Sequence, residues 1–588
     1  SEEFRTDRCF EGCTSETDTV MADSSADLKL GQASERVDVW THPYFLVGVI
    51  VFVGLAVRLA ALAHWGTGAI DSEGTEYARI AQNLRNGTGY VGLTSPGPQI
   101  GFPPFFPLLI AAVSFLTRDY EWAGRLVCLV SSSLLPLPIF GIASRLYNRR
   151  TGFVAALLTV FYPLLVNLSL AVLSEGLYIT MLLTAVYIVL VSLDRPSLRG
   201  YFFVGVFFGL TYLTRQEAVA PLLIALFLTM FLAKATVVSR SKWVTAAVAA
   251  FAIVALPEVV YLYRATGQIR LEEKSSLFYA ELVRIGIGQQ NHEVMPVEWA
   301  EHSINADLER TGTSNRSEVD VVRETQISLR QLAHNVKMGV GQNLPTLLQQ
   351  LSSRWMGAPF LSALALLGAL RRPWRRSLVS SHLYVLLVPL TAILATFTFS
   401  GWMALRYYFV LVPFLLIWAA NGLVGVGLWT KASVAAAGWH WISPVVTKWI
   451  VPGLIGLVVI LYPVRGVRSL WDFQQNSRAT QVIKQLGLWI GQQQNRQVMI
   501  MDRSTPLAFH ANAQWVDFPY CDGDLALRFL DAAKVDYVVL RQGENYTPYY
   551  HEWLLNGIPD RRAERVKVGS ASDGNEIIIF RWHREGIP

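Results

Sequence analysis

The chain has 588 residues, of which 52% are hydrophobic and only 16% are charged. That much apolar surface excludes a single soluble core and is typical of an integral membrane protein. The formal net charge of +6 does not indicate nucleic-acid binding, because lysine and arginine gather in short loops between apolar runs, where membrane topology accounts for them.

A polar leader, residues 1–42, precedes a series of apolar runs. The leader has the composition of disorder and lacks a signal peptide, so we expect the first run to act as an uncleaved signal anchor. The runs predict an α-helical polytopic membrane protein with about eleven transmembrane helices, and up to thirteen. They lie near residues 43–64, 122–146, 150–169, 175–193, 200–214, 218–233, 243–262, 352–370, 381–399, 404–428 and 448–464.

Basic loops set the predicted orientation of this membrane domain, residues 43–464. If the eleven runs alternate, every loop with a basic cluster falls on one side, and the positive-inside rule makes that side the cytoplasm. These loops lie at residues 144–150, 194–199, 234–242, 371–376 and 430–448. The leader is then cytoplasmic, and residues 65–121, 264–351 and 465–588 lie on the outer face.

The first external loop, residues 65–121, is expected to hold two juxtamembrane helices. Apolar residues at helical spacing predict a surface helix over residues 76–85. The apolar run 102–116 is too short for a span and carries prolines at its head, which favours a re-entrant or interfacial helix. An acidic group that begins at Asp71 precedes the first of these helices and is expected to face a cavity.

Residues 465–588 have the pattern of an external soluble α/β domain. Helices are predicted over 479–490 and 525–533, and strands over 497–501, 536–540, 565–568 and 576–582. The long external loop, residues 264–351, is polar, and its length favours a functional cover over a plain connector.

Several short motifs recur in order between residue 40 and about residue 430. They are DSEGTEYARIA at 71–81, GTGY at 87–90, FPPFFP at 102–107, LSEGLY at 173–178, LTRQEA at 213–218, and RYY at 406–408 followed by Pro413. The chain thereby resembles the dolichyl-phosphate-mannose-protein mannosyltransferase-like superfamily of GT-C glycosyltransferases, which includes glycosyltransferase family 39 and the aminoarabinose transferases of lipid A.

The resemblance implies the GT-C architecture and a mannosyltransferase-like activity on the outer face of the membrane. The donor would be a sugar linked to undecaprenyl or dolichyl phosphate, transferred with inversion to a protein, lipid or envelope-glycan acceptor. The location expected is the inner, cytoplasmic membrane of a bacterium. No nucleic-acid partner is expected, whereas a partner in a membrane complex stays open.

The resemblance assigns Asp71 the role of catalytic base, which deprotonates the acceptor hydroxyl. Many relatives carry two adjacent acids here, whereas Ser72 separates Asp71 from Glu73 in this chain. Glu73 is therefore a second catalytic candidate, and Glu76, a further acid of the same group, is a candidate for the acceptor or second acidic site. A plainer alternative is that Asp71 caps the helix that follows it.

The departing lipid phosphate needs a cation. Relatives carry a lysine before the twin prolines, but Phe102 occupies that position here. Arg215 and Arg406, at the outer ends of spans, are the main candidates, with Arg125 as a third. The alternative is that these arginines are interfacial residues that extend toward water.

Glu175 falls where the resemblance places a second acidic site. It could coordinate a divalent metal ion, orient the acceptor, or pair with Arg215 or Arg125. We favour the ion pair, since no set of histidines and carboxylates has a convincing metal spacing. Glu217 is either part of this site or an acid at the start of a helix. No cofactor is indicated, although the chemistry leaves room for a divalent metal ion.

Four aromatic residues fall on the cavity side of the predicted topology: Tyr90, Tyr162, Trp402 and Tyr407. Their rings could contact a sugar or line an isoprenoid groove, and the alternative is an interfacial aromatic belt. Two functions from other classes also stay open. The displaced acid and missing lysine leave room for a catalytically silent relative that is a structural or accessory subunit of a membrane complex. A transporter would need paired inverted repeats, which the sequence lacks.

Overall fold

The computed structural model describes residues 43–65, 68–95, 97–271, 358–371, 378–399, 405–437, 480–519, 521–542, 549–570 and 575–584, with isolated positions elsewhere. The chain divides into two compact units, Ser1–Val49 and Ile50–Pro588. Only residues 43–49 of the first unit are described, as the start of α2 (Pro43–Trp65). The leader 1–42, the predicted span 448–464 and most of the loop 264–351 lie outside the described residues, as do the residues next to the predicted boundary at 464.

The described part of the membrane domain is built from apolar helices. Five are long and apolar enough to cross a membrane, or six if the bent pair α7 (Arg149–Phe161) and α8 (Pro163–Leu170) counts as one span. Those five are Phe45–His64 in α2, Tyr120–Leu146, which joins α5 (Tyr120–Leu134) and α6 (Pro136–Leu146), α9 (Ser174–Asp194), α12 (Val237–Thr266) and Tyr408–Ala436, which ends in α19 (Val412–Ala436).

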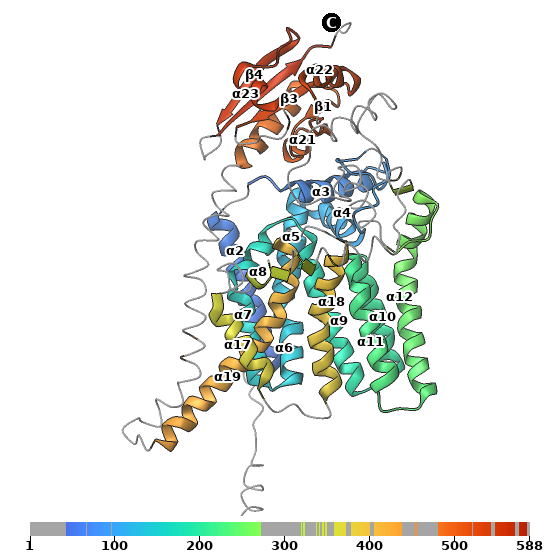
Figure 1. The fold of residues 1–588 in the computed structure, drawn as a ribbon, viewed down its shortest axis with the longest axis vertical. Coiled ribbons are helices and arrows are strands. Elements are labelled where there is room, and N and C mark those ends of the chain that lie inside the picture. The colour runs from blue at the N-terminus through green and yellow to red at the C-terminus, as the bar shows by residue number, and fades with distance from the viewer. Residues whose placement is uncertain are drawn as a thin grey trace, which may run out of the picture. The chain divides into compact units, whose positions relative to one another are not determined.

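Four other predicted runs appear as shorter or partly described helices. These are α10 (Leu198–Tyr212), α11 (Val219–Leu232), α17 (Ala358–Leu370) and α18 (Val379–Phe399). Figure 1 shows α6, α9, α10, α11, α12 and α18 side by side in one bundle. The predicted total of eleven spans stays a prediction.

Small residues let neighbouring helices of the bundle approach closely. A Cβ atom on Gly205 of α10 would lie 2.1 Å from the carbonyl oxygen of Ala247 in α12. A Cβ atom on Gly422 of α19 would lie equally close, 2.1 Å, to the carbonyl oxygen of Leu364 in α17. Helices in a membrane associate through such close packing because lipid supplies no hydrophobic drive between them. Glycine at these two positions therefore allows both helix pairs to pack this closely.

The loop over residues 65–121, which is predicted to be external, contains two helices, as expected. The first, α3 (Ser72–Arg85), begins four residues before the predicted start because Asp71 caps it. The second, α4 (Phe105–Thr117), begins after the twin prolines and ends at Arg118, which has a left-handed backbone with φ of 55°. Tyr77 joins the two segments through edge-to-face contacts with Phe102 and Phe106, at ring-centroid distances of 5.0 and 4.8 Å.

The C-terminal domain is an α/β sandwich around a five-stranded sheet in the order β2-β1-β3-β5-β4. Strands β1, β2 and β3 are parallel to one another, and β5 pairs antiparallel with β3 and β4. The strands are β1 (Met499–Met501), β2 (Gln514–Val516), β3 (Tyr537–Arg541), β4 (Ala563–Ser570) and β5 (Glu576–Trp582). Every residue of β3 is buried, as a central strand covered on both faces requires.

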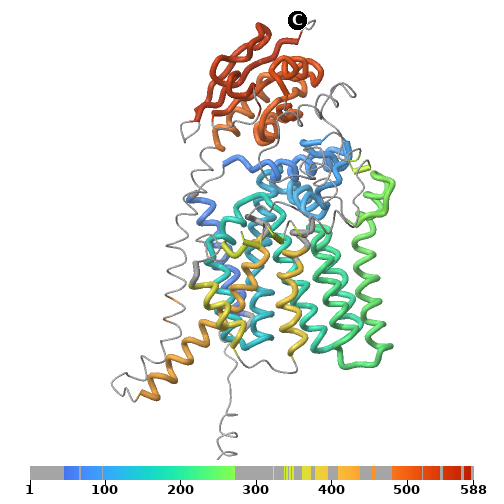
Figure 2. Tube along the Cα trace, viewed as in Figure 1, coloured from blue at the N-terminus to red at the C-terminus, as the bar shows by residue number. Residues whose placement is uncertain are grey.

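Helices cover both faces of this sheet. One hydrophobic cluster contains residues of α22 (Gly523–Ala532) and α23 (Tyr550–Asn556). The other contains residues of the helix 480–493 and of α21 (Pro506–His510). The predicted α/β domain is confirmed, and its predicted strands lie within a few residues of the observed ones. The tube in Figure 2 follows the same path, with the domain at the red end of the chain.

Candidate active site

Asp71 stands at the N-cap of α3. Its Oδ1 accepts a hydrogen bond of 2.8 Å from the backbone N–H of Gly74, while the residue as a whole is exposed. A Cβ atom on Gly74 would lie 2.9 Å from both Asp71 Oδ1 and the carbonyl oxygen of Val172. Glycine therefore allows the capped turn to pack against the segment that leads into α9. The structure shows the capping geometry, and that geometry leaves the carboxylate at a solvent-accessible position.

Glu73 is connected to the start of α9 through a tyrosine. The Tyr77 hydroxyl lies 3.3 Å from Glu73 Oε1 and 3.0 Å from Ser174 Oγ. Burial, and then the charges of Glu73 and Glu175, raises the pKa of Tyr77 well above its usual value, which keeps this hydroxyl protonated at neutral pH. The beginnings of α3 and α9, distant in sequence, therefore meet at one hydroxyl.

Glu175, Arg215 and Glu217 form a three-membered ion cluster. Arg215 donates from Nη1 to Glu175 Oε1 and from Nη2 to Glu217 Oε1, each at 3.0 Å. The Glu175 and Arg215 side chains are only 4% and 8% exposed, so the pair is shielded from water. In this cluster two carboxylates meet one guanidinium, an arrangement that attracts a second cation or a hydroxyl donor more readily than a phosphate.

The backbone fixes the position of Arg215. The N–H of Phe105, at the first turn of α4, donates a hydrogen bond of 2.8 Å to the carbonyl oxygen of Leu213, at the end of α10. Arg215 follows two residues later as the N-cap of a short 3-10 helix, η2 (Gln216–Ala218). The FPPFFP and LTRQEA motifs are therefore joined by a backbone contact.

Glu76 and Arg125 contact groups that lie outside the Arg215 cluster. The fully buried Glu76 carboxylate accepts hydrogen bonds from the N–H groups of Leu93 and Thr94 and from the Gln99 side chain, which holds the loop after α3. Burial raises the pKa of Glu76. Arg125 donates to Glu121 and to the carbonyl oxygens of Gly68 and Leu170. Neither contact set belongs to the Arg215 cluster, and the site roles predicted for these two residues stay predictions.

Of the four predicted aromatic contacts, the structure describes the side chains of two, Tyr90 and Tyr162. Tyr90 is half-buried, and its hydroxyl donates to the carbonyl oxygen of Phe102 at 2.7 Å. Tyr162 is 2% exposed and belongs to the main hydrophobic core of the bundle. Trp402 lies outside the described residues. Tyr407 and the predicted phosphate ligand Arg406 lie in the 3-10 helix η4 (Leu405–Leu411), where only their backbone is described.

A metal site was one of the alternatives for Glu175. Among the described residues, no three or more histidine, cysteine, aspartate or glutamate side chains form a group that could hold a metal ion. Oxygens of Glu175 and Glu217 are instead engaged by Arg215. The donor set in this part of the chain does not fit a resident metal ion, and no step below depends on one.

The chain is similar to one protein family in part of its sequence and to several solved structures in its fold. Residues 102–261 match the family model described as dolichyl-phosphate-mannose-protein mannosyltransferase. The archaeal oligosaccharyltransferase AglB from Archaeoglobus fulgidus is 12% identical, with 94% of this chain and 75% of that chain covered and a TM-score of 0.55. ArnT from Cupriavidus metallidurans is 12% identical, with 91% and 97% covered and a TM-score of 0.53. The membrane domain has the GT-C fold. Among curated proteins, none matches the sequence.

The C-terminal domain contacts the candidate site directly. The hydroxyl oxygens of Thr75 in α3 and Thr505 lie 2.6 Å apart. Lys484 donates to Glu121 Oε2 at 2.8 Å, and His510 Nε2 lies 3.9 Å from the same oxygen. Arg125, which pairs with Glu121, is the arginine that donates to Gly68, three residues before Asp71. The C-terminal domain therefore contacts both α3, which Asp71 caps, and the Glu121–Arg125 pair.

Sequence reasoning did not identify the residues that the C-terminal domain supplies to the candidate site. Thr505, Lys484 and His510 lie more than 350 residues from their partners in the chain. None belongs to a recognisable motif. The only sequence signal is that α21 begins at a proline, Pro506, directly after Thr505.

Proposed function

We propose that this protein is a membrane glycosyltransferase. It moves a mannose-like sugar from a polyprenyl-phosphate donor to a hydroxyl acceptor on the outer face of the inner membrane of a bacterium. The observation that carries the proposal is the meeting of the Asp71 turn with the Glu175–Arg215–Glu217 cluster through Val172, Ser174 and Tyr77. The GT-C fold and the family model for residues 102–261 support the same class.

Asp71 acts as the general base. Its carboxylate takes the proton of the acceptor hydroxyl while that oxygen attacks the anomeric carbon of the donor sugar. The bond between the anomeric carbon and the phosphate oxygen breaks, and polyprenyl phosphate leaves with the electron pair. Attack from the face opposite the phosphate inverts the anomeric configuration. The Gly74 N–H, which binds Oδ1, holds the carboxylate in one orientation.

We assign the Arg215 cluster to binding of the acceptor. Arg215 holds Glu175 and Glu217 by one hydrogen bond each, and these carboxylates can accept further hydrogen bonds from sugar hydroxyls. Glu73, linked to Ser174 through Tyr77, adds a third carboxylate near this point. Because two carboxylates accompany Arg215, we assign the lipid phosphate to Arg406 first, and keep Arg215 as the second candidate.

The lipid donor is supported by the structural neighbours. One structure of AglB from Archaeoglobus fulgidus was solved with an inhibitory peptide and a dolichol-phosphate. One structure of ArnT from Cupriavidus metallidurans was solved with undecaprenyl phosphate. Those ligands belong to proteins 12% identical to this chain, so the same class of lipid is a proposal here.

The test is transfer of labelled sugar by the purified full chain in lipid nanodiscs. A panel of undecaprenyl- and dolichyl-phosphate sugars serves as donors, and release of polyprenyl phosphate is measured together with labelled product. We expect at least one donor to be turned over. A chain that keeps its thermal unfolding transition but neither transfers nor hydrolyses any donor would instead be an accessory subunit of a membrane complex.

A further inference from the structure

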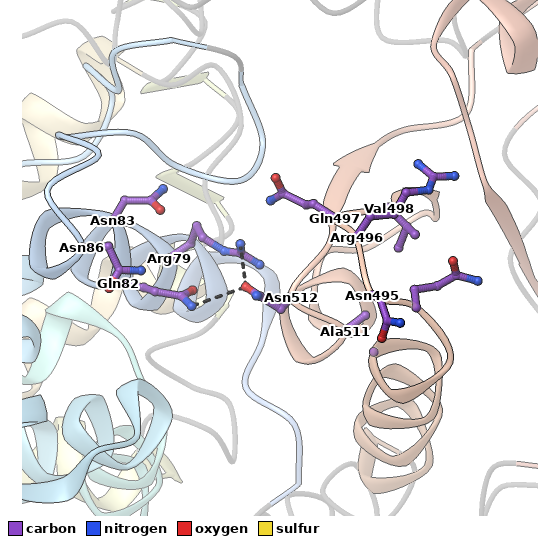
Figure 3. A pocket seen from close by; sticks show the side chains of 12 residues that line it. Arg79, Gln82, Asn83, Asn86, Asn495, Arg496, Gln497, Val498, Ala511 and Asn512 are labelled. Atoms are coloured by element: carbon purple, nitrogen blue, oxygen red, sulfur yellow. Dashed lines mark hydrogen bonds between the residues drawn. The ribbon is translucent and has the colours of Figure 1, made fainter.

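A polar cavity of about 420 Å³ lies between α3 and the C-terminal domain. Its α3 wall is a stripe of four polar residues at helical spacing: Arg79, Gln82, Asn83 and Asn86. The opposite wall comes from Gly491 and residues 494–498 together with Ala511 and Asn512. Figure 3 shows the two walls facing each other, with Gln497 extending from the C-terminal domain toward α3.

Side-chain amides dominate the lining, and they divide into two groups. Gln82 and Asn512 are hydrogen-bonded to each other across the cavity, while Asn83 and Gln494 bond to Val91 and Tyr537. No side-chain hydrogen bond to the described residues is found for the other three, Asn86, Asn495 and Gln497. Within that part of the chain, the first group has members on both walls and is held by hydrogen bonds, whereas the second group remains available to a ligand.

Arg79 adds a buried cation to this wall. It is 5% exposed, and it donates to Asn512 Oδ1 at 3.3 Å and to the carbonyl oxygen of Ala513 at 3.2 Å. Its Nε–H is buried and has no partner among the described residues. Burial lowers the pKa of Arg79 to about 10, so the guanidinium stays charged at neutral pH. Arg79 therefore supplies a positive charge to this wall, and the three amides are the groups left to bind a polar ligand.

We propose that this cavity is a binding subsite for a hydroxyl-rich glycan chain, the acceptor of the reaction proposed above, on which this inference rests. An amide group donates and accepts hydrogen bonds at once, which matches a hydroxyl group better than it matches an anion or an apolar group. The volume lies in the range of small-molecule sites, whereas the polar lining sets the cavity apart from the mainly apolar pockets of most ligands.

The cavity and the candidate base belong to the same helix. Asp71 caps the start of α3, and the polar stripe begins at Arg79 and ends at Asn86. At about 1.5 Å per residue, the stripe lies about 12 to 22 Å along the helix axis from Asp71. A ligand that occupies the cavity and presents a hydroxyl to Asp71 must therefore be a chain of several sugars.

The test measures binding without transfer. The full chain is purified in a detergent that has no sugar headgroup, and binding of linear glucose and mannose heptasaccharides is followed by isothermal titration calorimetry. We expect at least one heptasaccharide to bind. The double variant Asn495→Ala with Gln497→Ala should weaken binding by about tenfold, since each lost neutral hydrogen bond contributes a modest factor.

Two comparisons make the outcome decisive. The matched control, Gln492→Ala with Gln493→Ala, changes two exposed amides of the same helix end that do not line the cavity, and it should bind like the unaltered chain. Absence of binding by the unaltered chain, or equal binding by the Asn495 and Gln497 double variant, would overturn the subsite. A chain that transfers sugar but binds no heptasaccharide keeps the proposed function and loses this inference, while one that binds but never transfers does the reverse.

Discussion

Thr75 and Thr505 place their hydroxyl oxygens 2.6 Å apart, although 430 positions separate them in the chain. Thr75 also donates to the carbonyl oxygen of Ser72 at 2.7 Å, and the Thr505 hydroxyl lies 3.3 Å from the same oxygen. These three groups fix the first turn of α3, which Asp71 caps. The C-terminal domain is therefore part of the structure that orients the candidate base.

Replacing Thr505 by valine removes this contact at nearly constant volume. We expect the free energy of unfolding to fall by about 1 kcal/mol, because a buried hydroxyl loses its partner. If the turn positions Asp71, kcat for sugar transfer should also fall, by up to about tenfold, while KM for the donor changes little. Thr505→Ser keeps the hydroxyl and should restore kcat. Equal losses in the serine and valine variants would show that the hydroxyl contact has no positioning role.

The Glu175–Arg215 pair offers a way to separate structure from chemistry. Arg215→Gln removes the cation between two carboxylates, and we expect the protein to lose about 3 kcal/mol of stability, since Glu175 is almost fully buried. The double variant Arg215→Gln with Glu175→Gln replaces both charges and should recover much of that loss. Transfer should stay low in both variants if Glu175 binds the acceptor. Recovery of transfer along with stability would make the pair purely structural.

His510 should make the stability of the folded protein depend on pH, and the direction follows from its lowered pKa. Burial lowers its pKa to about 4, below the unfolded value near 6.5, despite the opposing effect of Glu121. The stability contributed by the neutral imidazole is present above pH 6.5 and is lost as the pH falls toward 4. The loss should reach about 2 to 3 kcal/mol. The charged groups acting on the imidazole are Glu121, Lys484, Asp119 and Arg125.

Thermal unfolding of the full chain between pH 7.5 and pH 4.5 measures this effect. His510→Gln should flatten the profile in the interval between pH 6.5 and 4, because glutamine does not titrate. His551→Gln is the control: His551 is an exposed histidine in α23 of the same domain, and its replacement should leave the profile unchanged. A profile that His510→Gln does not alter would contradict the assignment.

Local patterns predicted much of this fold. Short runs with the pattern of strands located β3, β4 and β5 within a few residues, helical spacing located α3, and an apolar run headed by prolines located α4. Apolar spacing predicts a start at residue 76, four residues after the observed one, because the first turn of α3, residues 72–75, has no large apolar residue. Short helices such as α21 and α23 were missed, since five or seven residues carry too little periodicity.

Contacts between distant segments could not be predicted from these patterns. An ion pair was the favoured role for Glu175, but its partner was left open between Arg215 and Arg125, because sequence order alone does not show which residues of distant segments meet. The hydrogen bond of Thr505 with Thr75 has no sequence signal at all, since it depends on how the C-terminal domain docks on α3. The available amides Asn86, Asn495 and Gln497 became recognisable as one surface only when the fold placed them around one cavity.

The most direct test of the central claim is single-turnover sugar transfer by Asp71→Asn. Asparagine caps a helix as well as aspartate does, so the fold should persist while the base is lost. The matched control is Asp119→Asn, since Asp119 caps α5 in the same loop by accepting from the Trp122 N–H at 3.0 Å. We predict that Asp71→Asn slows transfer at least about a hundredfold and that Asp119→Asn does not. Transfer by Asp71→Asn at the rate of the unaltered chain would contradict the account.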